Sequence, residues 1–251
     1  MELIEHPPIF RIPGIPDQVL YMWFVMGILL VVAVVATRRL QLVPRGSQNF
    51  MEIVLDQFVN ELDETIGHDG RHYLPLVATL GLFILVSNLM GLVPGLIATT
   101  ANLNTTAACA LIVFFTYHVI GVRKQGLIPY LKHFAGPVPG PLKPLMFVIE
   151  VISHLARPLS LSLRLFGNIF AGGVLVHTML GIAPFIMFIF LGLELFVGAI
   201  QALIFTMLSL VFLSIANTGH GHDPHDPGHT NETQEEEYAE MRYAEMREAH
   251  H

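Results

Sequence analysis

Long uncharged apolar runs alternate with short polar segments along most of this chain. The first run covers residues 19–36, and no aspartate, glutamate, lysine or arginine occurs from residue 74 to residue 122. A helix needs about 20 mostly apolar residues to cross a bilayer. The first run therefore predicts one membrane-spanning helix, and the second predicts two, over residues 74–93 and 104–122, joined by a polar turn.

The second half of the chain predicts two longer helices that form a hairpin. One covers about residues 145–180 and the other residues 184–216, where proline suits the first helical position. A helix of about 33 residues extends about 50 Å, whereas the hydrocarbon layer is about 30 Å thick. We therefore expect the hairpin to be steeply tilted. A stiff, non-helical connection before it is predicted by Pro137, Pro139, Pro141 and Pro144.

Residues 47–66 follow a different pattern, that of an amphipathic helix. Apolar residues recur there at helical spacing, while Glu52, Asp56 and Asp63 occupy other faces. We interpret the segment as a helix that lies on the membrane surface or on a neighbouring subunit; an ordinary surface helix is the alternative. The predicted fold class is an all-α membrane protein with five transmembrane helices and one interfacial amphipathic helix.

Composition supports a membrane protein and separates a tail from the rest of the chain. Hydrophobic residues make up 53% and charged residues 13% of the sequence, against about 25% charged residues in average globular chains. The net charge of −7 arises within residues 218–251, so the rest of the chain is balanced and has no basic footprint for nucleic acid. We expect one transmembrane domain over residues 1–217 and a flexible, charged tail. A metal site is less favoured there, although the tail contains His220, His222, His225 and His229.

The distribution of basic residues predicts the orientation in the membrane. Arginines follow the first predicted span, and arginines and lysines follow the third. Cytoplasmic loops carry an excess of lysine and arginine, so we expect the N-terminus outside and the C-terminus in the cytoplasm. The basic residues concerned are Arg38, Arg39, Arg45, Arg123, Lys124, Lys132 and Lys143.

Arg164 lies within the apolar sequence of the first hairpin helix. A charge in the centre of a membrane costs at least about 3 kcal/mol, and arginine does not reduce this cost by losing its proton. Ser160 and Asn168 lie four residues to either side, and Glu150 and Ser153 fall near the same stripe of the helix. We interpret the stripe as facing a wet pathway; an arginine–glutamate pair within one bundle is the alternative.

The second hairpin helix carries two further polar groups on one face. Glu194 and Gln201 are seven residues apart, and Glu194 lies deep in apolar sequence, where an ionised carboxylate is costly. Glu194 is thus a candidate to accept and release protons, or else a structural partner of Arg164. His177 is a candidate imidazole one turn after Gly173, or an ordinary interfacial histidine.

Two motifs give the chain a family resemblance. The sequence Ser-Leu-Arg-Leu-Phe-Gly-Asn at 162–168, followed by a long apolar helix with Gln-Ala-Leu-Ile-Phe at 201–205, resembles subunit a of F-type ATP synthases. The resemblance implies a non-catalytic stator subunit with no cofactor. Its implied partners are a ring of c subunits with membrane-embedded carboxylates, peripheral-stalk b subunits and the bilayer of a bacterial plasma membrane, without nucleic acid or bound nucleotide.

The resemblance also implies roles for individual residues. Arg164 would separate two half-channels that load and unload protons on the rotor ring. Part of the family has an acid at the position of Gly173 and a histidine at that of Glu194, which suggests that the two positions face one another. The outer half-channel would be lined by Glu194, His177 and Gln201 and the inner one by Glu150 and Ser153, with Asn168, Ser160 and Gln201 orienting Arg164.

Two other functions are possible for an arginine in a membrane helix. A secondary transporter, with Arg164 binding an anionic substrate, predicts inverted repeats and interrupted helices. The sequence shows neither feature, because its two halves differ in length, polarity and motif. An intramembrane metalloenzyme needs a ligand set such as His-Glu-x-x-His on a helix, and the sequence has none. It has no phosphate-binding P-loop either, which predicts that ATP is handled by other subunits.

Overall fold

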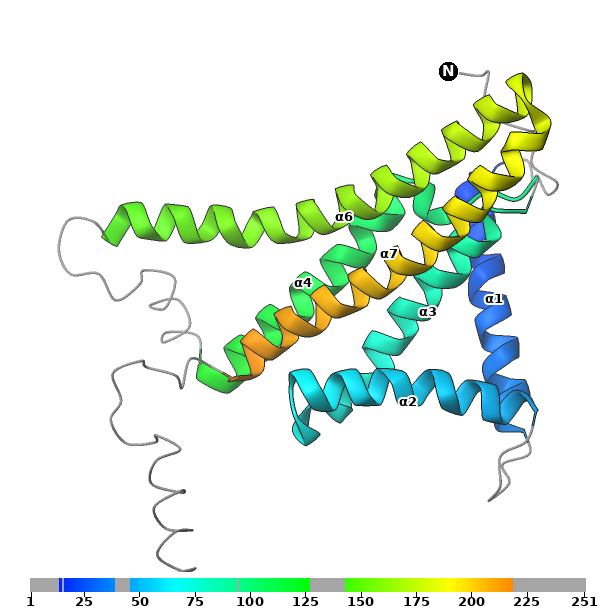
Figure 1. The fold of residues 1–251 in the computed structure, drawn as a ribbon. Coiled ribbons are helices and arrows are strands. Elements are labelled where there is room, and N and C mark those ends of the chain that lie inside the picture. The colour runs from blue at the N-terminus through cyan, green and yellow to red at the C-terminus, as the bar shows by residue number, and fades with distance from the viewer. Residues whose placement is uncertain (1–13, 15, 39–45, 94, 127–142, 219–251) are drawn as a thin grey trace, which may run out of the picture. The chain divides into compact units, whose positions relative to one another are not determined.

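The computed structural model describes residue 14 and residues 16–38, 46–93, 95–126 and 143–218. Within these residues the chain is all-helical, and five of its helices are long and apolar enough to cross a membrane. The prediction of an all-α membrane protein is confirmed. The helices are α1 (Asp17–Thr37), α2 (Ser47–Thr65), α3 (Leu74–Met90), α4 (Leu103–Gln125), α6 (Lys143–Ile182) and α7 (Pro184–Thr218), with 3₁₀ turns η1 (His68–Tyr73) and η2 (Thr99–Ala101) (Figure 1).

Some predicted boundaries are wrong. Helix α3 ends at Met90 and not at residue 93, and α4 continues to Gln125, past the predicted end at residue 122. The sequence places Pro144 in the connection before the hairpin, but α6 already begins at Lys143. A proline in the first turn costs nothing because the N–H it lacks has no partner within the helix there. The other three prolines of that connection and the predicted tail lie outside the described residues.

A four-helix core holds α3, α4, α6 and α7 together. Ile84, Leu165 and Phe205 are fully buried in it, and Val113 is 1% exposed. Each of these residues comes from a different helix, so each helix turns one apolar face inward. The hairpin helices are thereby fixed against α3 and α4, which positions the polar groups that they carry.

The amphipathic helix α2 packs at one end of this core. Leu62 is fully buried among residues of α3, α4 and α7, whereas Ile53 is 60% exposed. The Ser214 hydroxyl of α7 donates a hydrogen bond to the Thr65 carbonyl, with 2.8 Å between the oxygens. The sixth helix is thus present, attached through its apolar face, and its place on the membrane surface stays a prediction.

The two hairpin helices are longer than a bilayer is thick. Helix α6 has 40 residues and α7 has 35 residues, which corresponds to about 60 and 50 Å at 1.5 Å per residue. Both run obliquely to α1, and α6 changes direction along its length (Figure 1). Pro158 lies inside α6 and has no N–H for the carbonyl of His154, which accounts for a bend there.

Candidate functional site

Arg164 lies near the middle of α6, on its exposed side. The opposite face of the same turn is fixed in the core by Leu161 and Leu165, which are 2% and 0% exposed. Within the described residues, Arg164 makes no hydrogen bond or ion pair. Arg164 and Glu194, which the alternative interpretation pairs, therefore form no ion pair in the described structure.

An amide pair joins the two hairpin helices one turn after Arg164. Asn168 Nδ2 donates a hydrogen bond to Gln201 Oε1 at 2.8 Å. Gln201 is only 2% exposed, and its Nε2 has no acceptor within the described part of the chain. The structure thus brings together two of the predicted residues, which bond to each other and not to the guanidinium.

Glu194 is half-buried on α7 and lies against two glycines of α6. A Cβ atom at Gly172 would lie 3.3 Å from the Glu194 Cδ, and one at Gly173 would lie 3.9 Å from Oε1. A side chain at Gly172 would therefore crowd the carboxylate, whereas a Cβ atom at Gly173 would make an ordinary van der Waals contact with it. His177, one turn further along α6, is also half-buried.

A buried polar network connects α3, η2 and α7, and the sequence did not predict it. Asn88 Nδ2 of α3 donates to the Gly198 carbonyl of α7 at 2.8 Å, and Thr100 Oγ1 donates to Asn88 Oδ1 at 2.6 Å. The hydroxyls of Ser87 and Thr99 also bond to each other. The sequence marked Thr99 and Thr100 as part of a polar turn, but nothing in it indicated that this turn is tied to α7.

The remaining predicted residues lie on α6 before Arg164. Glu150 is half-buried, with Oε1 3.2 Å from His154 Nε2. Ser153 and Ser160 are exposed and form no side-chain hydrogen bond within the described residues. His154 was missed, although its place four residues after Glu150 on a helix was a usable signal.

The comparison with known families identifies the chain. A family model described as ATP synthase A chain matches residues 19–214. The chain belongs to the ATP synthase subunit a family. Its five apolar helices and this membership make it a multi-pass membrane protein of the ATP synthesis and ion transport machinery.

Individual relatives agree with the family model. An ATP synthase subunit a of Pelobacter propionicus is 49% identical over 198 residues, 78% of this chain and 86% of that protein. One from Geobacter sulfurreducens is 48% identical over 198 residues, 78% of this chain and 86% of its own length. One from Citrifermentans bemidjiense is 49% identical over 209 residues, 83% of this chain and 90% of its own length.

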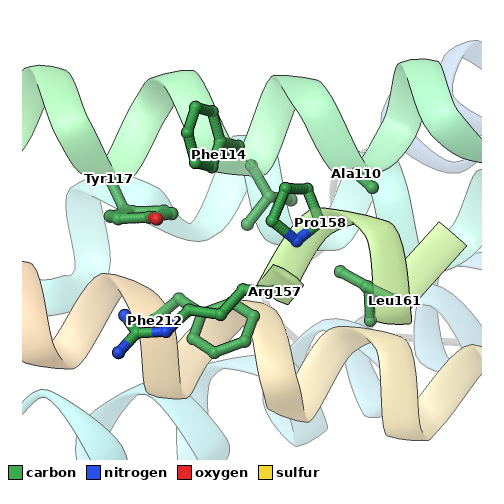
Figure 2. Close-up of a pocket in the computed structure, with 8 residues that line it drawn as sticks. Ala110, Phe114, Tyr117, Arg157, Pro158, Leu161 and Phe212 are labelled. Carbon is green, nitrogen blue, oxygen red and sulfur yellow. The ribbon is translucent and has the colours of Figure 1, made fainter. Parts of the chain in front are cut away.

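In this subunit a chain, a pocket lies between α4, α6 and α7 beside Pro158 (Figure 2). Arg157 and Phe212 line it from α6 and α7, and Phe114 and Tyr117 line it from α4. The Arg157 guanidinium carbon lies 5.6 Å from the centre of the Phe212 ring, within the range of a cation–π contact. Arg157 is therefore engaged with an aromatic ring, seven residues before Arg164.

Proposed function

We propose that this chain is the membrane stator subunit of an F-type ATP synthase, in which Arg164 separates two proton half-channels. The observation that carries the proposal is Arg164 itself, a permanent cation inside an apolar span. It is exposed, and it has no hydrogen-bonding or ionic partner within the described residues. Because an unpaired charge in a bilayer is costly, the stabilising partner is supplied by another chain.

The proposed partner is an ionised carboxylate of a c-subunit ring. A fixed guanidinium attracts this carboxylate, displaces its proton and blocks a direct passage between the half-channels. A neutralised rotor carboxylate then faces lipid at lower cost than an ionised one. Each elementary charge that crosses gains about 2.3 kcal/mol per 100 mV, so torque accumulates from many small electrostatic steps.

The polar groups around Arg164 divide into two proposed half-channels. Glu194 and His177 line the outer one together with Gln201, which is bonded to Asn168 beside Arg164. Glu150 and Ser153 line the inner one, about three to four turns before Arg164. Ser160 and Asn168 flank the guanidinium by one turn on each side and orient it in the assembled complex.

The same proposal covers orientation and partners. Arg38 directly follows α1, and Arg123 and Lys124 lie in the last turn of α4. These two helix ends lie on the side of α2 (Figure 1), which we place in the cytoplasm. Lipid and peripheral-stalk b subunits cover exposed apolar surface such as Trp23 of α1, which is 57% exposed. The chain performs no bond chemistry itself. No observation favours the alternative of a secondary transporter.

The test replaces Arg164 by alanine in the assembled complex. We expect ATP-driven acidification of inverted vesicles to be lost, because no cation then displaces the rotor proton. After the soluble head is removed, we expect a passive proton leak above the wild-type rate, because the half-channels are no longer separated.

The matched control for Arg164→Ala is Arg123→Ala. Arg123 is an exposed cation in the last turn of α4, and its loss is expected to leave pumping unchanged. Normal ATP-driven acidification in an assembled complex that carries Arg164→Ala would show that the separator role is wrong.

A further inference from the structure

A chain of hydrogen-bonded side chains crosses from α6 to α4 before the bend in α6. Glu150 Oε1 lies 3.2 Å from His154 Nε2, and His154 Nδ1 lies 3.0 Å from the Tyr117 hydroxyl. The Tyr117 and His154 rings are nearly parallel, with an interplanar angle of 29°. Both imidazole nitrogens are therefore bonded, one to a group of the same helix and one to the neighbouring helix.

The two partners determine which nitrogen carries the proton. An ionised carboxylate only accepts hydrogen bonds, so Nε2 carries the hydrogen towards Glu150, and Nδ1 of the neutral ring accepts from the Tyr117 hydroxyl. When the ring is protonated, Nδ1–H donates to the same hydroxyl oxygen, which both donates and accepts. When Glu150 takes the Nε2 proton, the neutral ring keeps its hydrogen on Nδ1 and donates it to the Tyr117 oxygen, so the contact with Tyr117 persists in every protonation state.

Burial increases along this chain. The Glu150 side chain is 34% exposed and the His154 side chain 13%, and Tyr117 is 3% exposed. The carboxylate is accessible, whereas the hydroxyl is fixed in the core. Tyr117 therefore acts as a rigid support for the imidazole, and Glu150 is the member that is free to exchange protons with water.

The charges that face His154 come from both packed helices. Glu150 and Arg157 lie on α6 and carry opposite charges. On α4, the centre of the His118 ring lies 5.4 Å from the centre of the His154 ring. The described part of α7 contributes the apolar ring of Phe212 to this region, 6.1 Å from the ring of Tyr117. His118 itself bonds through Nδ1 to the Phe114 carbonyl of its own helix, at 2.9 Å.

We propose that His154 is a proton-exchanging residue of the inner half-channel, working with Glu150 and positioned by Tyr117. It rests on the proposed function, in which Glu150 lines that half-channel. In the step, the Nε2–H bond of the imidazolium breaks as a Glu150 O–H bond forms, so an ion pair becomes two neutral groups. Neutral Glu150 is no longer attracted to the ring and gives its proton to water, and Nε2 accepts the next proton from the path. Ionised Glu150 then returns to the imidazolium.

The experiment uses the assembled complex in inverted vesicles with the soluble head removed. Passive proton conduction is measured as a function of pH in wild type and in His154→Gln, which keeps a donor for Glu150 but does not titrate. We expect conduction to fall about a hundredfold or more, the scale of a lost general acid–base group. We also expect the limb of the pH profile that belongs to the imidazole to disappear.

Two further variants separate titration from support. Tyr117→Phe removes the hydrogen bond to Nδ1, and we expect a smaller, few-fold loss with the pH limb shifted but still present. His118→Gln removes the neighbouring imidazole, and we expect conduction within twofold of wild type. If His154→Gln does not assemble, Glu150→Gln is measured instead, with loss of the same pH limb as the expected result.

The outcomes distinguish this inference from the proposed function. Wild-type conduction and an unchanged pH profile in His154→Gln, or in Glu150→Gln, would overturn the role of His154 while leaving the role of Arg164 intact. A conduction loss in His118→Gln with normal His154→Gln would also overturn it. Absence of proton conduction in the wild-type complex would instead contradict the proposed function.

Discussion

The Gln201 amide is buried between α6 and α7 with its oxygen bonded and its nitrogen without an acceptor in the described residues. An unpaired buried donor costs about 1–3 kcal/mol, whereas a single hydrogen bond contributes about 1 kcal/mol net. The amide is therefore retained at a cost in stability. We interpret that cost as serving the polar path beside Arg164.

This interpretation predicts the effect of Gln201→Leu. We expect the thermal midpoint of the purified complex to stay level or rise, because the unpaired donor is removed and exposed Asn168 turns to water. We expect ATP-driven proton pumping to fall, because an apolar side chain interrupts the path. A lower thermal midpoint would contradict this and show that Nε2 has a partner in the complex.

The control for Gln201→Leu is Gln57→Leu. Gln57 lies on the exposed side of α2, where its Nε2 bonds to Glu61 at 2.9 Å. Exposed substitutions of this kind change stability by less than about 0.5 kcal/mol. We expect both pumping and the thermal midpoint to match wild type.

At the scale of the elements, the bend in α6 sets the direction of the helix segment that carries Arg164. The helix before Pro158 carries Glu150 and His154, and the helix after it carries Arg164 and Asn168. In a straight α6 the two parts would share one axis. Their polar groups would then point in other directions, relative to α4 and α7, than they do in the bent helix. The proline is a poor helix residue kept at a position where direction matters.

Replacing Pro158 by alanine tests this view. Alanine is about 3 kcal/mol more favourable than proline inside a helix, so we expect the thermal midpoint to be unchanged or higher. We expect the rate of ATP-driven pumping to fall several-fold, because a straighter α6 displaces Arg164 relative to Gln201. The control is Pro184→Ala at the first position of α7, where proline is tolerated and little change is expected. Full pumping in Pro158→Ala would contradict a functional bend.

At the scale of the whole molecule, a few buried polar bonds connect segments that are far apart in the sequence. Asn88 of α3 bonds to Gly198 of α7, 110 residues away, and to Thr100 in the turn before α4. Gly198 leaves just enough space, because a Cβ atom there would lie 3.2 Å from the Asn88 Cβ. Asn88 thus ties the turn η2 and the helix that carries Glu194 to one another.

We predict that Asn88→Ala destabilises the subunit within the complex. It leaves the buried Thr100 hydroxyl without its acceptor, at a cost of about 1–3 kcal/mol, which is expected as a lower thermal midpoint. Thr79→Val serves as the control, since the exposed Thr79 hydroxyl bonds to the Pro75 carbonyl of its own helix at 2.6 Å. An equal effect of both substitutions would show that the Asn88 network has no special weight.

Much of the candidate site was visible in the sequence because charge is rare in this chain. Arg164, Glu194 and Gln201 stand out as polar groups in apolar runs, and their spacing along each helix follows from 3.6 residues per turn. Tyr117 and Asn88 did not stand out. Tyrosine and asparagine are common near membrane helices, and α3, which carries Asn88, has no charged residue that would mark a polar stripe.

The sequence by itself determined the helices and their lengths, because a bilayer requires about 20 apolar residues for each crossing. Only the tertiary structure decided which faces meet. Tyr117 meets His154 at a separation of 37 residues, and Glu194 meets Gly172. These contacts depend on the rotation and crossing of each helix. A helix such as α7 is apolar almost all round, so its sequence pattern does not specify which side faces the core.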